Sequence, residues 1–116
     1  MLPRRVRNHL CGIAGNAQPI TYQALAQALE LTPPNTIHQL TVALEHLIED
    51  NALAGRPLIA ALVISRARGG LPAPGFFECA KRVGRFHGDA FGKEAVAFYE
   101  AEFDEAVEFW PSLTLK

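Results

Sequence analysis

Hydrophobic residues recur at helical spacing along most of this chain of 116 residues. The most regular repeat predicts a helix over residues 35–54, and Gly55 follows at a position where helices commonly end. The same spacing predicts helices over 4–17, from Tyr22 after a Thr21 cap, over 77–83 and over 90–110. In the last of these we place the middle of the apolar side at Val96, Tyr99, Phe103, Val107 and Trp110.

One segment departs from this pattern. Residues 58–64 are seven consecutive apolar residues, which cannot alternate between core and solvent, so they predict a strand buried on both faces. The Gly- and Pro-rich stretch 69–75 permits only a short edge strand afterwards. We therefore expect a central strand, an exposed arm carrying Arg66 and Arg68, and a return into the core at residues 76–77.

These elements predict a mainly α fold with a small β element (α+β). Its core would resemble a winged helix-turn-helix, with additional helices at both ends of the chain. The length fits a single domain over residues 1–116. Within it we expect an N-terminal helix (1–19), the winged-helix-like core (20–77) and the C-terminal helices (78–116).

Composition narrows the class of protein. Hydrophobic residues make up 49% and charged residues 20% of the chain, which is typical of a globular protein. No stretch approaches the roughly 18 apolar residues of a membrane span, and polar residues interrupt the N-terminal segment, so we expect a cytoplasmic protein without a membrane partner. Cys11 and Cys79 are far apart and predict buried free thiols. Nothing in the sequence indicates a cofactor.

The net charge of −1 conceals an asymmetry along the chain. Residues 56–85 contain six basic side chains and one acidic side chain. Residues 93–116 contain two basic and six acidic ones. One part of the surface could therefore face an anion that another part repels.

Residues 20–75 resemble the DNA-binding half of O6-alkylguanine alkyltransferases and alkyltransferase-like proteins. The likeness rests on ITYQALAQALEL, then HQLTVAL, then a buried apolar segment and a glycine turn. In that family a Tyr precedes a Leu-Ala pair and presses on the phosphate of a nucleotide whose base is rotated out of the helix. The resemblance implies this role for Tyr22, and it places His38 where the family has an arginine that fills the vacated stack.

The resemblance ends where the family's chemistry occurs. The enzymes carry a Pro-Cys-His-Arg motif, whereas residues 57–60 read PLIA and contain no nucleophile. Neither Cys11 nor Cys79 lies near this position in the chain. We therefore expect no alkyl transfer and no enzyme.

The leading hypothesis is a non-enzymatic domain that binds nucleic acid, with duplex DNA as the expected partner. The residues predicted to contact it are Tyr22, Asn35, His38, Arg66, Arg68, Lys81, Arg82 and Arg85. The alternative is a protein-interaction or assembly domain, such as a homodimer. Simpler roles stay open for these residues: a half-buried aromatic for Tyr22, a surface position for His38, and a solvated edge for Arg66 and Arg68.

Two further features bear on chemistry. His87 and Asp89 lie in a glycine-rich loop, a pairing that could serve a metal or a general base, but no second group of ligands accompanies them. We therefore expect a loop and no metal site. Glu102 falls inside the apolar side of the last helix, where an unpaired carboxylate is costly, so it should pair with an arginine. The candidate partners are Arg5, Arg7 and Arg56.

Overall fold

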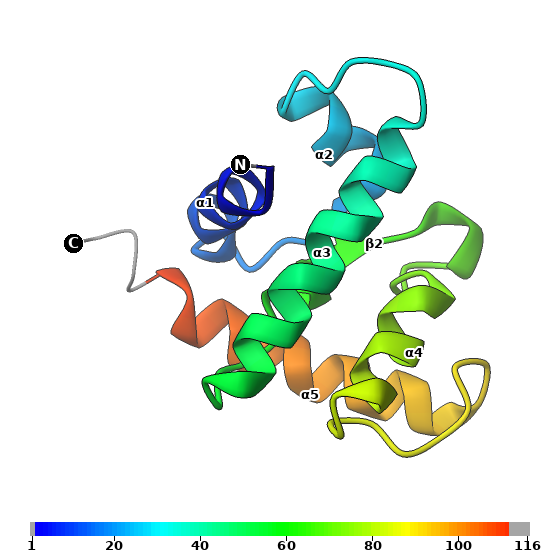
Figure 1. The fold of residues 1–116 in the computed structure, drawn as a ribbon. Helices are drawn as coiled ribbons and strands as arrows, with labels where there is room; N and C mark the ends of the chain where they lie inside the picture. The colour runs from blue at the N-terminus through cyan, green and yellow to red at the C-terminus, as the bar shows by residue number, and fades with distance from the viewer. Residues whose placement is uncertain (1, 112–116) are drawn as a thin grey trace.

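The computed structural model describes residues 2–111 and is mainly helical (Figure 1). The helices are α1 (Leu2–Ala14), α2 (Tyr22–Ala28), α3 (Thr36–Leu53), α4 (Pro74–Arg82) and α5 (Lys93–Phe109). Two short strands are β1 (Ile20–Thr21) and β2 (Val63–Ile64), and two 3-10 turns are η1 (Ile59–Leu62) and η2 (Arg66–Arg68). The predicted combination of many helices with a small β element is confirmed.

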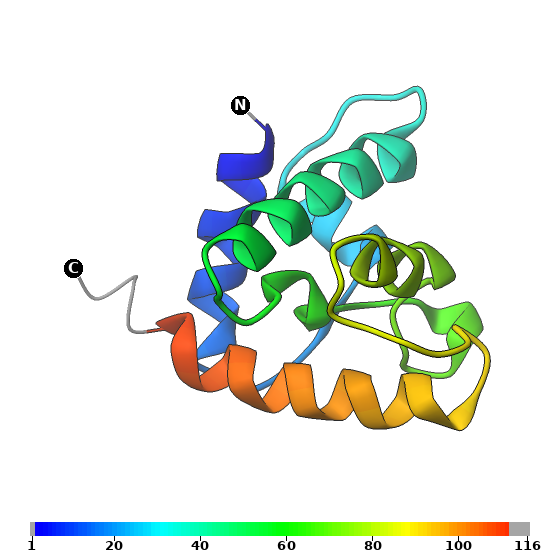
Figure 2. The same cartoon turned by 60° about the horizontal axis from the view of Figure 1, so that its bottom comes forward.

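The helices surround η1, which lies at the centre of the molecule. Helix α3 crosses the molecule diagonally, and α1, α2 and α4 pack against it (Figure 1). Helix α5 runs along the lower edge in Figure 2, and α1 stands against its C-terminal end. Because α1, α3 and α5 all contact η1, the hydrophobic core is built around this short turn.

Residues 58–63 of the apolar run are buried as predicted and Ile64 is half-buried, but the predicted seven-residue strand is wrong. Leu58 to Val63 are each at most 3% exposed, yet residues 59–62 form a 3-10 turn and only Val63 and Ile64 are in a strand. Side chains take the place of a neighbouring strand here. The Leu58 N–H donates to the Glu102 carboxylate of α5 (3.0 Å), and the Ile59 N–H donates to the Asn51 amide oxygen of α3 (3.0 Å). An apolar run specifies burial, and these partners then allow a turn.

The two strands pair in parallel, with Ile20 opposite Val63 and Thr21 opposite Ile64. The edge strand expected after β2 is wrong, because η2 turns the chain instead. Gly69 has a φ of 65° and reverses the direction, and the Ser65 N–H closes the loop on the Leu71 carbonyl at 2.8 Å. The sheet of residues 2–111 thus has two strands and no antiparallel hairpin.

Helix ends follow the local signals closely. The predicted Thr21 cap is confirmed, since its hydroxyl accepts the Ala24 N–H at 3.1 Å. Helix α1 ends at Ala14, earlier than predicted, because Gly15 and the following residues form a turn. Helix α4 begins at Pro74 and not at residue 77, since proline suits the first turn of a helix. Both cysteines are free and buried, as predicted.

The buried side of α5 is rotated from the predicted one. Glu102 lies on it with Ala95 and Ala106, while Val96 is 40% exposed and Phe103 is half-buried. The acidic residue that interrupted the apolar pattern therefore marks the middle of the buried side. Within residues 2–111, no helix is both long enough and apolar enough to cross a membrane.

Candidate nucleic-acid interface

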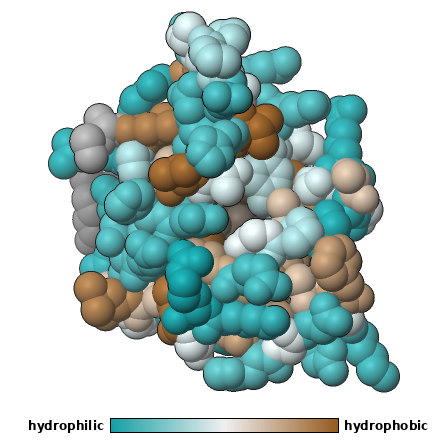
Figure 3. Space-filling view, turned by 45° about the vertical axis from the view of Figure 1, so that its right-hand side comes forward, coloured by the Kyte–Doolittle hydropathy of each residue, from teal (hydrophilic) through white to brown (hydrophobic). Residues whose placement is uncertain are grey.

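A hollow of about 370 Å³ lies between the start of α2, the first turns of α3 and the loop after β2. Its lining includes Tyr22, Ile37, Thr41, Ser65, Arg66 and Ala73. Arg66 is the only charged residue in that lining, and no acidic side chain contributes to it. The molecular face in Figure 3 is mainly hydrophilic, with hydrophobic side chains in separate groups. The hollow is thus open, partly apolar and positively charged at one side.

Tyr22 is half-buried, and its hydroxyl accepts the Ala73 N–H at 3.1 Å. Burial raises the pKa of this phenol, and the hydrogen bond from Ala73 opposes that rise less strongly. The hydroxyl therefore keeps its proton at neutral pH. Because it accepts one bond here, its own hydrogen is left to donate, and it donates no hydrogen bond within residues 2–111.

The start of α3 borders the hollow through Ile37 and Thr41. Asn35 precedes the helix with a φ of 61°, and its side chain makes no capping bond. Asn35 and His38 are both exposed. The Gln39 amide instead ties the preceding loop to the helix, donating to the carbonyls of Thr32 at 3.1 Å and Pro34 at 3.0 Å. The first N–H groups of α3 have no side-chain cap and could donate to an anion.

The two predicted arm arginines are in different environments. Arg66 is exposed and has no ion pair within the described residues. Arg68 is half-buried, donates to the Ala90 carbonyl at 2.6 Å, and lies 4.6 Å from the ring centroid of Phe91. Arg68 therefore fastens the loop before α5 to the body of the protein, which leaves Arg66 as the arm's free guanidinium among residues 2–111.

Lys81 and Arg82 are exposed on α4, and each is paired with a glutamate. Lys81 lies 3.8 Å from Glu78, and Arg82 lies 3.1 Å from Glu49 of α3. The hydrogen bond to Glu49 is the main cause of a raised pKa of Arg82. These pairs break the basic region that the sequence suggested, because each cation is next to a carboxylate that repels phosphate.

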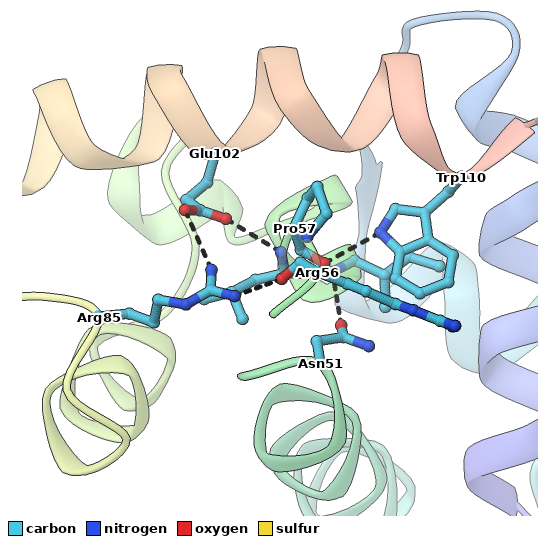
Figure 4. Close-up of polar contacts among 8 residues, drawn as sticks. Asn51, Arg56, Pro57, Arg85, Glu102 and Trp110 are labelled. Carbon is cyan, nitrogen blue, oxygen red and sulfur yellow. Dashed lines mark hydrogen bonds and ion pairs between the residues drawn. The ribbon is translucent and has the colours of Figure 1, made fainter. Parts of the chain in front are cut away.

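Arg85 takes part in a buried polar cluster (Figure 4). Its guanidinium lies 3.5 Å from the Glu102 carboxylate and also donates to the Arg56 carbonyl. The predicted pairing of Glu102 with an arginine is confirmed, but none of Arg5, Arg7 and Arg56 provides the guanidinium. Arg85 supplies it because the turn after α4 brings this residue to the middle of α5. Burial raises the pKa of Glu102, and the Leu58 N–H and Arg85 oppose that rise.

In the loop that contains His87 and Asp89, the Asp89 carboxylate has a local structural role. Asp89 accepts the Phe91 N–H at 2.9 Å, which stabilises the turn before α5. His87 is exposed. Among residues 2–111, no three His, Cys, Asp or Glu side chains gather closely enough to hold a metal ion.

The structure thus divides the eight predicted contacts. Tyr22 and Arg66 line one hollow, Asn35 and His38 lie at the adjoining start of α3, and the other four are paired or turned inward. Ile37, Thr41 and Ser65 also line the hollow and were not predicted. Ser65 comes beside Tyr22 because β1 and β2 pair in parallel, a pairing of two-residue strands that leaves little pattern in the sequence. Comparisons of the chain with protein-family models, curated proteins and solved structures found no match.

Proposed function

We propose that this protein binds nucleic acid through the hollow bordered by Tyr22 and Arg66, without acting on it chemically. The observation that carries the proposal is the lining itself. The hollow combines the exposed Arg66 guanidinium, which has no ion pair within residues 2–111, with the Tyr22 hydroxyl, whose proton is not used in a hydrogen bond there. No acidic residue lines it. Such a set of donors suits a phosphate, which offers only acceptors.

A phosphate at the rim would accept from the Arg66 guanidinium and from the first N–H groups of α3. Those N–H groups also carry the positive end of the helix dipole. The Tyr22 proton would serve a second oxygen, and Ile37 and Ala73 would contact sugar or base. The family resemblance adds that Tyr22 would press on a phosphate and that His38 would lie beside the base stack.

We further propose that α2 and α3 act as the two helices of a helix-turn-helix and that the loop containing Arg66 takes the place of a wing. Glu45 and Glu49 on α3 would repel phosphates if the whole helix entered a groove. Contact would therefore be limited to its first turn. The expected footprint is about two or three phosphates, which means weak binding with a log–log salt slope of roughly −2 to −3.

The proposal also states that the protein does not catalyse a reaction on the nucleic acid. Cys11 and Cys79 are buried, burial raises the pKa of both thiols, and neither lines the hollow. A protonated, enclosed thiol is a poor nucleophile. The resembling enzymes carry their cysteine in the segment that corresponds to residues 57–60. Here residues 58–60 are buried in the core, and the segment supplies no replacement nucleophile.

The test is binding of a labelled DNA duplex, followed by fluorescence anisotropy at about 20 mM salt, near which screening is weak. Arg66→Ala should weaken binding several-fold and reduce the salt slope by about one unit, since one phosphate contact is lost. Lys93→Ala is the matched control, because it removes an exposed charge on α5 and should leave affinity nearly unchanged. Equal effects of both changes, or no binding by the parent protein, would refute the proposal.

One observation favours a second candidate, an assembly domain. Val96, Tyr99, Phe103 and Val107 lie at helical spacing along α5, and all four are exposed or only half-buried. A second copy could cover this flank. Sedimentation equilibrium over a hundredfold concentration range would show a dimer that Phe103→Ser abolishes. A monomer at every concentration would eliminate this candidate.

A further inference from the structure

A second hollow, of about 540 Å³, lies between the N-terminal half of α1 and the C-terminal half of α3. It is lined in part by Arg4, Arg7, Asp50, Asn51, Arg56 and Trp110. None of these residues borders the hollow beside Tyr22, so the two sites are separate. The lining is unusual because most of its polar groups are hydrogen-bond donors.

Three guanidinium groups come to this hollow from two parts of the chain. Arg4 and Arg7 are one turn apart on α1 and so share a face of that helix, while Arg56 follows α3. Asp50 is the single acidic residue of the lining. No ion pair involving any of these four side chains occurs among residues 2–111. The positive charges are therefore not neutralised within the part of the chain that the structure describes.

Asn51 supplies the observation that distinguishes this hollow from an ordinary basic surface. It is only 4% exposed, and its amide oxygen accepts the Ile59 N–H at 3.0 Å. The atom facing a backbone N–H must be an acceptor, so the amide nitrogen points the other way. That nitrogen lies on the same side as the Arg56 guanidinium (Figure 4) and makes no hydrogen bond within the described residues. It is not sealed from solvent, because the buried side-chain atom without a partner in residues 2–111 is Arg68 Nη1, so the amide nitrogen is open to the hollow.

The guanidinium groups that share the hollow can only donate, so they cannot accept from this amide, and Asp50 makes no hydrogen bond with it. Trp110 also lines the hollow. Its indole N–H already donates to the Pro57 carbonyl at 3.1 Å, so this side chain serves only as a wall. An anion with several acceptor oxygens could accept from this amide and from the guanidinium groups at the same time. Guanidinium groups bind both carboxylates and phosphates, but a phosphate offers more acceptor oxygens and more charge to donors that approach from α1 and from Arg56.

We propose that this hollow binds a phosphate group, either free phosphate or the phosphomonoester of a small molecule. Arg4, Arg7 and Arg56 neutralise the charge, and the Asn51 amide donates to one oxygen. The site does not depend on the proposed nucleic-acid interface. Trp110 is the only tryptophan of the chain, so its fluorescence reports on this hollow alone.

The experiment is a fluorescence titration of the full chain with inorganic phosphate, with adenosine monophosphate and with acetate, all at constant ionic strength set with chloride. Phosphate or the nucleotide should change the Trp110 signal saturably, and acetate should not. Tighter binding of the nucleotide identifies a phosphomonoester site, and tighter binding of phosphate identifies a free-phosphate site. No saturable change with either, or a change produced only by a DNA duplex, would overturn the proposal.

Variants test the residues. The double change Arg4→Gln, Arg7→Gln removes two exterior charges and should weaken binding by about tenfold or more. Asn51→Asp keeps the acceptor for Ile59 but replaces the donor with a carboxylate, so it should weaken binding similarly. Arg66→Gln, outside this hollow, should bind like the parent protein. If the Asn51→Asp protein melts at a lower temperature than the parent, the test rests on the double arginine variant. An unchanged affinity of that variant for phosphate would overturn the proposal.

Discussion

Replacing Glu102 with alanine should destabilise the protein far more than any change at the neighbouring exposed acidic positions. Glu102 is 8% exposed, and its carboxylate joins three parts of the fold. It accepts the Leu58 N–H at the entrance to the central turn, and it pairs with Arg85 after α4. Alanine would leave a buried N–H without an acceptor and a guanidinium without its carboxylate.

The magnitude follows from these two losses. An unsatisfied buried N–H costs about 1–3 kcal/mol. The Arg85 side chain is 25% exposed, so solvent compensates part of the lost ion pair, and the pair adds roughly 1 kcal/mol. We expect the free energy of unfolding to fall by about 2–4 kcal/mol, which lowers the melting temperature by roughly 6 to 20 °C.

The assay is chemical and thermal denaturation followed by circular dichroism, with Glu105→Ala as the control. Glu105 lies on the exposed side of the same helix, so its removal should change stability by only about 0.5 kcal/mol. Equal losses for both variants would refute the assignment of Glu102 as a structural link between α5 and the central turn.

Glu102→Gln tests the electrostatic part of the same argument. The folded-state pKa of Glu102 is raised above its ordinary value of 4.5, so its contribution to stability is fully present below that value. The contribution is lost as the pH rises through the folded-state pKa. Glutamine keeps an acceptor and does not titrate. The parent protein should therefore lose stability relative to Glu102→Gln as the pH rises from 4.5 through the folded-state pKa of Glu102. A pH-independent difference would contradict the shift.

Three further outcomes are expected. Truncation after Gly92 removes α5, and calorimetry should show loss of the cooperative transition, whereas melting near the parent temperature would make α5 an appendage. Cys11 and Cys79 should react slowly with a thiol reagent in the native state, because burial raises the pKa of both thiols. For the same reason, incubation with O6-alkylguanine DNA should leave the intact mass of the protein unchanged. A mass increase on either cysteine would contradict this expectation. Trp110→Phe should lower stability by about 1 kcal/mol through loss of its indole hydrogen bond, measured by urea denaturation.

Sequence patterns predicted burial better than conformation. The apolar run of 58–64 predicted the centre of the core, but its turn depends on Asn51 and Glu102, which come from helices distant in sequence. A periodicity analysis treats the two residues as polar positions on separate helices. Only the assembled fold shows that each satisfies a backbone N–H of the same short segment.

Charge along the chain was a weaker guide to the candidate interface. The basic residues of 56–85 form a cluster in sequence, yet Arg82 and Arg85 face glutamates on α3 and α5, and Arg68 holds a loop. Conversely, Tyr22 and Arg66 are far apart in the chain and come together through a two-residue parallel pairing. Spacing rules describe neighbours along one element, and they do not predict which charges a tertiary contact neutralises.

The proposed interface can be located directly by titrating the ¹⁵N-labelled protein with a DNA duplex at low salt. The largest amide shifts should occur in residues 36–41 and 65–67, with smaller shifts around Tyr22. Helix α5 should be almost unchanged. Shifts concentrated on α5, spread evenly over the surface or absent altogether would contradict the proposal that this protein binds nucleic acid through the hollow between α2, α3 and the loop after β2.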